Sequence, residues 1–155
     1  MNGAHLHLIV THVPVVGSAF GLFLLFWGLA KGSEEIKRAA LGALLLSALL
    51  ALPAFFSGEP ANTRVASQPG VLRETVEQHQ DLALAALIVT EIVGAVALTG
   101  LVVFRSPKTF PKWFASILVL VVLGSVALLA WTSNLGGRIR HPEIREGTTT
   151  QLHQR

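Results

Sequence analysis

The sequence predicts an all-α integral membrane protein, a four-helix bundle with up-down-up-down topology. Three observations lead to this fold class: few charged residues, a positive mean hydropathy and four long apolar runs. Charged residues make up 14% of the 155-residue chain and hydrophobic residues 52%, whereas soluble domains carry about 25% charged residues. The mean hydropathy is +0.59. A chain of this length is expected to form one domain.

Each apolar run is long enough to cross a bilayer. The runs cover residues 13–30, 39–56, 82–104 and 114–131. At 1.5 Å per residue, even the shortest forms a helix about 27 Å long, close to the hydrocarbon thickness of a membrane. The runs are apolar on every side, as lipid-embedded helices are. The chain also has too little polar sequence to cover them as a soluble protein would.

Helix-breaking residues separate the runs. Pro14 lies at the expected start of the first helix, where proline costs no hydrogen bond. The pair Gly136-Gly137 follows the fourth run and is expected to end that helix. The longer connections are a loop at 57–78 and a tail at 135–155, both expected on the outer side.

Basic residues predict the orientation in the membrane. Of the 12 Lys and Arg residues, six lie in the two short connections, and six are spread through the longer loop and the tail. The positive-inside rule therefore places the short connections in the cytoplasm of a bacterium, with both termini on the periplasmic side of the inner membrane. The scattered charges argue against a nucleic-acid partner. The residues in the short connections are Lys31, Lys37, Arg38, Arg105, Lys108 and Lys112.

The chain has no cysteine. This excludes disulfides, iron–sulfur clusters, thiolate-bound zinc and covalently attached haem. A bound metal must then be held by His, carboxylate or carbonyl groups, or lie within a porphyrin. No nucleophile–base pair near a pocket and no phosphate-binding glycine loop is recognisable, so we do not expect an enzyme acting alone.

Five of the 6 histidines gather at one face. Because the helices alternate in direction, the start of the first run and the end of the second meet the start of the third and the end of the fourth. Histidines stand at three of these places, and the opposite face has none. The sequence therefore predicts a site at the outer face, near His5, His7, His12, His79 and His141.

His12 and His79 are the favoured haem ligands. They stand at the boundaries of the first and third runs, which lie diagonally opposite in the predicted bundle. Two imidazoles that face each other across a bundle can bind the iron of haem b from both sides, and neutral imidazole also suits copper and zinc. Helical spacing places His79 on an inward stripe with Leu72, Val76, Ala83 and Ala86.

Arg138 and Arg140 lie at the same face. Their guanidinium groups suit the propionates of a haem, or carboxylates such as Glu59. Two alternatives stay open: a structural accessory subunit without a cofactor, and a site for a bare copper, zinc or iron ion. The ligands of the bare ion would be His5, His7, His12, Glu59, His79 and His141.

Glu91 lies in the middle of the third run, where an ionised carboxylate is costly. Such residues serve protons, ions or quinone, and Glu91 is a candidate proton or quinone group. The alternative is a structural hydrogen bond to Ser47, Thr90 or Ser125.

Small residues recur along two of the runs. Gly17 and Gly21 in the first run and Gly94 and Gly100 in the third permit close helix packing. A flat porphyrin between helices would need such small residues as well.

Four motifs recur in order along the chain: a His-x-Pro entry to the first run, Ser-Gly-Glu-Pro-Ala after the second, Gly-Val with Glu-x-His before the third, and Gly-Gly with a basic, His-containing tail after the fourth. With them the chain resembles a widespread group of small bacterial four-helix membrane proteins of unknown function, over residues 5–143. One departure is Gln80, where the group often has an acidic residue, and this favours haem over a bare ion or weakens the site. The resemblance implies a fold and a residue set but no activity. The matching segments are His12–Pro14, Ser57–Ala61, Gly70-Val71, Val76–His79, Gly136-Gly137 and Arg140–Glu143.

The sequence thus favours a membrane electron-transfer protein that binds haem b near its outer face, alone or as a subunit of a larger respiratory complex. Electrons would pass between a membrane or periplasmic redox partner and quinone or a neighbouring subunit.

Overall fold

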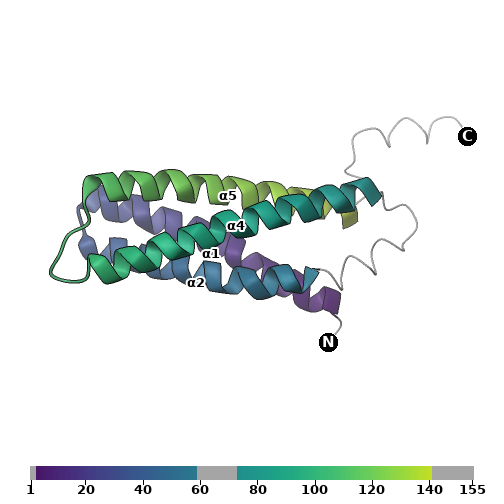
Figure 1. The fold of residues 1–155 in the computed structure, drawn as a ribbon, viewed down its shortest axis with the longest axis horizontal. Coiled ribbons are helices and arrows are strands. Elements are labelled where there is room, and N and C mark those ends of the chain that lie inside the picture. The colour runs from purple at the N-terminus through teal and green to yellow at the C-terminus, as the bar shows by residue number, and fades with distance from the viewer. Residues whose placement is uncertain (1–2, 59–72, 141–155) are drawn as a thin grey trace, which may run out of the picture.

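The structure is a computed structural model that describes residues 3–58 and 73–140, without the side chains of residues 3–9 and 140. Within these residues it is all-helical, and the helices run along one long axis (Figure 1). This confirms the predicted all-α four-helix bundle. The helices are α1 (Gly3–Lys31), α2 (Glu34–Phe56), α4 (Arg73–Val103) and α5 (Lys112–Arg140).

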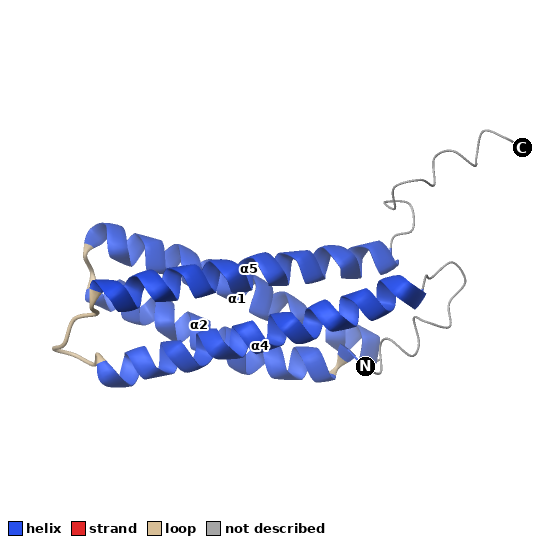
Figure 2. Cartoon of the chain, turned by 45° about the horizontal axis from the view of Figure 1, so that its top comes forward, coloured by secondary structure: helices blue, strands red, loops and turns tan. Residues whose placement is uncertain are grey.

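The helices that follow one another in the chain are neighbours in the bundle. α1 packs on α2, α2 on α4 and α4 on α5, and a smaller α1–α5 contact closes the bundle. α1 and α4 therefore lie diagonally opposite, as do α2 and α5. The α1–α2 and α4–α5 connections share one end, here called the inner end, and the start of α1 and the end of α5 lie at the opposite, outer end (Figures 1 and 2).

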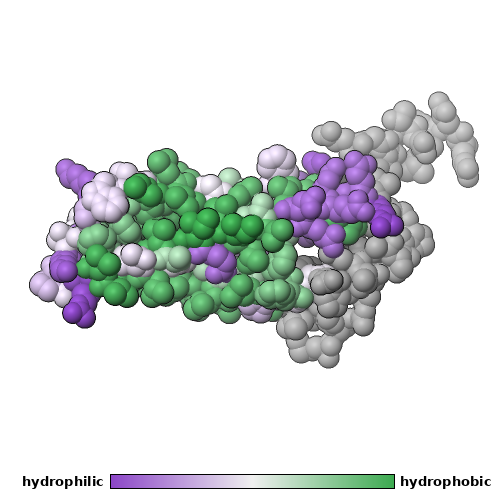
Figure 3. Space-filling view, in the orientation of Figure 1, coloured by the Kyte–Doolittle hydropathy of each residue, from purple (hydrophilic) through white to green (hydrophobic). Residues whose placement is uncertain are grey.

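The surface of the bundle suits lipid. All four helices are long and apolar enough to cross a membrane. Large apolar side chains point outward, with Leu120 70% and Val16 63% exposed. Figure 3 shows this apolar surface as a broad band between hydrophilic ends. Trp113 and Trp131 are exposed near the two ends of α5, where an aromatic belt is expected.

Two helix boundaries differ from the prediction. α1 begins at Gly3 and has Pro14 in its interior, and α5 continues through Gly136 and Gly137 to Arg140. The predicted start at Pro14 and the predicted end at Gly136-Gly137 were both wrong, because a helix in a membrane satisfies its own backbone groups and neighbouring helices can compensate for an interior proline or glycine.

α4 also begins earlier than the apolar run, at Arg73. Its first turns are polar and are supported by pairs four residues apart. Arg73 Nε donates to Glu77 Oε1 over 3.0 Å, and Gln78 Nε2 donates to Glu74 Oε1 over 3.3 Å. The apolar run therefore marked the lipid-embedded part of the helix and not its full length.

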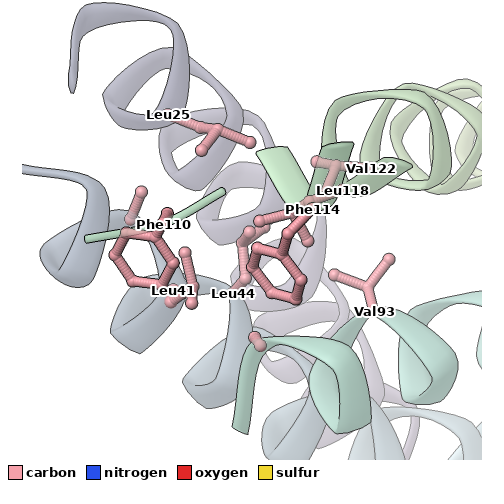
Figure 4. Packing of buried hydrophobic residues seen from close by; sticks show 10 residues of the cluster. Leu25, Leu41, Leu44, Val93, Phe110, Phe114, Leu118 and Val122 are labelled. Carbon is pink, nitrogen blue, oxygen red and sulfur yellow. The ribbon is translucent and has the colours of Figure 1, made fainter. Parts of the chain in front are cut away.

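The main apolar core lies towards the inner end. Phe114 stacks on Phe110 with ring centroids 5.8 Å apart and meets Phe104 edge-on at 5.1 Å. Figure 4 shows the surrounding leucine and valine side chains, which come from all four helices. A Cβ on Gly100 would lie 2.6 Å from Leu41 Cδ2 and from Phe114 Cζ, so the predicted close packing at this glycine is confirmed.

Polar contacts join the two connections at the inner end. Arg38 Nη2 donates to the carbonyl oxygens of Phe104 and Lys108, over 3.2 and 2.6 Å. Glu34 pairs with Lys37 and accepts a 3.1 Å bond from the backbone N–H of Phe110. These contacts hold the inner ends of the helices together.

Candidate functional site

His79 lies in the seam between α4 and α5 at the outer end. Its Nδ1 is 3.1 Å from the backbone oxygen of Thr132 on α5. A carbonyl oxygen only accepts hydrogen bonds, so Nδ1 carries the proton and donates it, and the lone pair of the neutral ring is on Nε2. Histidines that bind metals commonly donate their other N–H to a backbone carbonyl in this way, which orients the ring and sets its tautomer.

Gly136 makes room for this ring. A Cβ at position 136 would lie 3.2 Å from Cε1 of His79, and 3.7 and 3.8 Å from its two nitrogens. Thr132 and Gly136 are one helical turn apart, so together they form the surface of α5 on which the imidazole rests. At Gly137 a Cβ would meet nothing within 4 Å. The glycine pair that was predicted to end the helix therefore contains one residue that shapes the site.

The predicted inward stripe of α4 is confirmed where it is described. Val76 and Ala86 are buried and His79 and Ala83 are half-buried, while Leu72 lies outside the described residues. Thr90 continues the same face and is buried as well. His79 is therefore the outermost polar group of an otherwise small and apolar helix face.

His12 lies on the exposed side of α1. The buried stripe of α1 contains Pro14, Ser18 and Leu25, whereas His12 is exposed. Two residues correspond to about 200° around a helix, so position 12 lies on the far side from position 14. The diagonal placement of the two helices was predicted correctly, but the rotation of α1 turns this histidine away from the core. Position 7 is two helical turns before Pro14 in α1.

The remaining predicted ligands are described only in part. Arg138 is exposed on α5, and position 140 is the last residue of that helix. Positions 5 and 7 lie in α1 without described side chains, and Glu59 and His141 lie outside the described residues. Among the side chains that the structure does describe, no three His, Asp or Glu groups come close enough to hold a metal ion.

A groove of about 450 Å³ opens on the α4–α5 seam beside His79. This volume is within the usual range of small-molecule sites. Two of its residues, Gln78 and Leu135, are the chain neighbours of His79 and Gly136, so the groove and the imidazole belong to the same part of the seam. Sequence reasoning missed it, because it exists only where two helices meet. Its lining combines three polar and three apolar side chains, Gln78, Asp81, Arg138, Leu82, Trp131 and Leu135.

Glu91 lies deeper in the bundle. It is 12 residues beyond His79 in α4, which is about 18 Å along the helix. Its Oε1 is buried and has no hydrogen-bond partner. Thr90 and Ser125 bind each other instead, over 2.9 Å, and Ser47 donates to the backbone oxygen of Ala43. The predicted structural bond between Glu91 and one of these hydroxyls is therefore wrong.

No protein-family model matches the chain, and no curated protein or solved structure is significantly similar to it. The resemblance to the small bacterial four-helix proteins thus stays a prediction. What the structure itself establishes is a bundle of four apolar helices that fits a lipid bilayer, with one oriented histidine in the outer half of the α4–α5 seam.

Proposed function

We propose that the protein binds haem b near its outer end and carries electrons, with His79 as an axial ligand. The observation that carries this proposal is the 3.1 Å contact between Nδ1 of His79 and the Thr132 oxygen, because metal-bound histidines are commonly oriented by such a bond, and Nε2 would then be the ligating nitrogen. A porphyrin supplies the equatorial ligands of its iron, so one or two imidazoles are enough. A bare ion needs more protein donors in one place.

The buried side chains of α2 and α4 in the outer half support a flat cofactor. From Ser47 onward the buried residues of α2 are that serine and Ala48, Ala51 and Ala54. Ala86 of α4 is also buried. The larger buried side chains of this half, Leu129, Leu135 and Ile139, all come from α5. A wide, thin ligand between helices requires side chains of this kind, and a haem when bound would supply a one-electron centre there.

A histidine of α1 would supply the second ligand to the haem iron. His12 is exposed, whereas position 7 is two helical turns before the buried Pro14 in α1, so we propose His7 in place of His12. Arg138 lies in the groove beside His79 and, with Arg140 two residues later, would hold the propionates. Guanidinium groups bind carboxylates with two parallel hydrogen bonds.

The groove on the α4–α5 seam is the proposed place for a quinone. Its apolar side consists of Leu82, Leu135 and Trp131, and on its polar side Gln78 offers both a donor and an acceptor, which leaves Arg138 to the haem propionates. A quinone has the same division between a polar ring and an apolar tail. Electrons would pass between such a quinone and a membrane or periplasmic redox partner, and the protein would serve alone or as a subunit of a respiratory complex.

The spectrum of the purified protein tests the cofactor. We expect protein purified in mild detergent to show a Soret band, and extracted pigment to be haem b. Bound copper, zinc or iron without a Soret band would replace this proposal with the bare-ion site. If the protein contains neither haem nor a metal ion after growth with added haem precursor and metals, it would be a structural accessory subunit without a cofactor.

The membrane and the orientation are also part of the proposal: a bacterial inner membrane with both termini in the periplasm, from the positive-inside rule. The chain has no cysteine, so single cysteines report sidedness. Gln80→Cys at the outer end and Ser106→Cys at the inner end are both at exposed positions. In intact spheroplasts, a membrane-impermeant maleimide should label the first variant and label the second only after lysis. The reverse pattern would invert the topology.

A further inference from the structure

Glu91 is the one charged residue within the four apolar runs. Its Oε1 is covered by the chain and makes no hydrogen bond, yet the residue as a whole remains partly exposed. A polar group without a partner is costly inside a membrane, and acidic residues there normally pair with another polar group. Glu91 therefore needs a partner that the four described helices do not supply.

Among the described residues, the hydroxyls of Ser47, Thr90 and Ser125 bind groups other than Glu91. Thr90 and Ser125 bind each other, and Ser47 binds the backbone of its own helix. On α4 the side facing the core is marked by Val93 and Ala97, which are 2% and 0% exposed. Glu91 lies at the flank between this side and the lipid-facing side, so its flexible side chain can reach outward.

The lipid-facing side of α4 carries small side chains that would let another helix pack closely against it. Ala95 and Thr99 follow Glu91 by one and two turns, and both are exposed small residues. The Thr99 hydroxyl donates to the backbone oxygen of Ala95 over 2.8 Å, so its hydrogen bond is made within its own helix. Small residues in this spacing let two membrane helices approach closely. Leu84, Ile88 and Val102 complete an exposed apolar stripe around them.

We propose that this side of α4 pairs with the α4 of a second copy, and that the two Glu91 carboxyl groups, both uncharged, bind each other. An uncharged carboxyl group has one donor and acceptor oxygens, so it is complementary to itself. A two-fold axis along the membrane normal places identical residues opposite each other. Both copies then keep the same orientation in the membrane. The proposal does not depend on haem binding.

Disulfide cross-linking in native membranes tests the dimer. In Ala95→Cys the two introduced thiols lie near the two-fold axis, and copper phenanthroline can oxidise them to one disulfide by accepting two electrons as two protons leave. We expect a covalent dimer on a non-reducing gel. Ser116→Cys is the matched control, because position 116 is exposed on α5, and it should remain monomeric.

Adding a second substitution tests the role of Glu91. Glu91→Leu in the Ala95→Cys background should reduce cross-linking about ten-fold. Glu91→Gln should retain it, because a glutamine side chain also has a donor and an acceptor. Failure of Ala95→Cys to cross-link would overturn the proposal even if Glu91→Leu does not fold. Equal cross-linking of Ser116→Cys would overturn the proposal as well, and would indicate random collision. Equal cross-linking of the Glu91→Leu variant would also overturn it, and would indicate that a lipid or quinone binds Glu91 instead.

Discussion

Replacement of His79 with alanine should lower the haem content of the purified protein at least about ten-fold. This is the largest functional effect that we expect from one substitution, because it removes the proposed ligand together with its bond to Thr132. The ratio of Soret absorbance to protein absorbance gives the measurement. Elution of the variant at the wild-type volume in size-exclusion chromatography shows that the bundle is intact.

His12→Ala is the matched control for His79→Ala. His12 is exposed and lies away from the buried stripe of α1, so this variant should retain most of the haem, whereas His7→Ala should lose it. Retention by His7→Ala and loss by His12→Ala would restore the ligand pair that the sequence favoured and would require α1 to rotate when haem binds. Full retention by His79→Ala would remove the basis of the site.

Substitution of Gly136 with valine should have the second-largest effect. Even a single carbon at position 136 would lie 3.2 Å from Cε1 of His79, and the branched side chain of valine would force the imidazole out of the seam. We expect haem content to fall several-fold while the helical circular dichroism stays unchanged, because α5 keeps its backbone hydrogen bonds.

Gly137→Val makes the same chemical change one residue later. Nothing lies within 4 Å of a Cβ at that position, and the change in helix propensity is the same for both variants. The comparison therefore separates displacement of His79 from a general effect on α5. Equal haem loss in the two valine variants would show that the glycine pair acts through the helix and not through the histidine.

The fold class of this protein is determined by its sequence. In a membrane, helices satisfy their own backbone groups, so four apolar runs of sufficient length leave few other architectures. The alternation of helix direction then brings His79 to the same end as the start of α1. The inward placement of His79 also followed from spacing alone, because a stripe of small apolar residues marks the buried face of α4.

Helix ends and helix rotation were decided only by the tertiary structure. Pro14 and Gly136 strongly destabilise helices in water, but both lie inside helices here. In lipid, an unwound backbone would have no water to bind its N–H and C=O groups, so the helical conformation is retained. The exposure of His12 has a related cause: α1 is apolar all round, and in its sequence only small residues such as Gly17 and Gly21, which pack against Ser47 and Leu44 of α2, mark the side that faces the bundle.

The chemistry of the site likewise depends on contacts between helices. Sequence identifies His79 as a candidate ligand, but its tautomer is set by a backbone oxygen of α5 that no side-chain pattern reveals. Glu91 gives the converse case. Its position in the membrane is evident from the sequence, and only the packing shows that Thr90 and Ser125 satisfy each other and leave the carboxyl oxygen without a partner. Hydrophobic patterning thus determines which segments enter the membrane, while the directional hydrogen bonds between segments determine what the polar residues can do there.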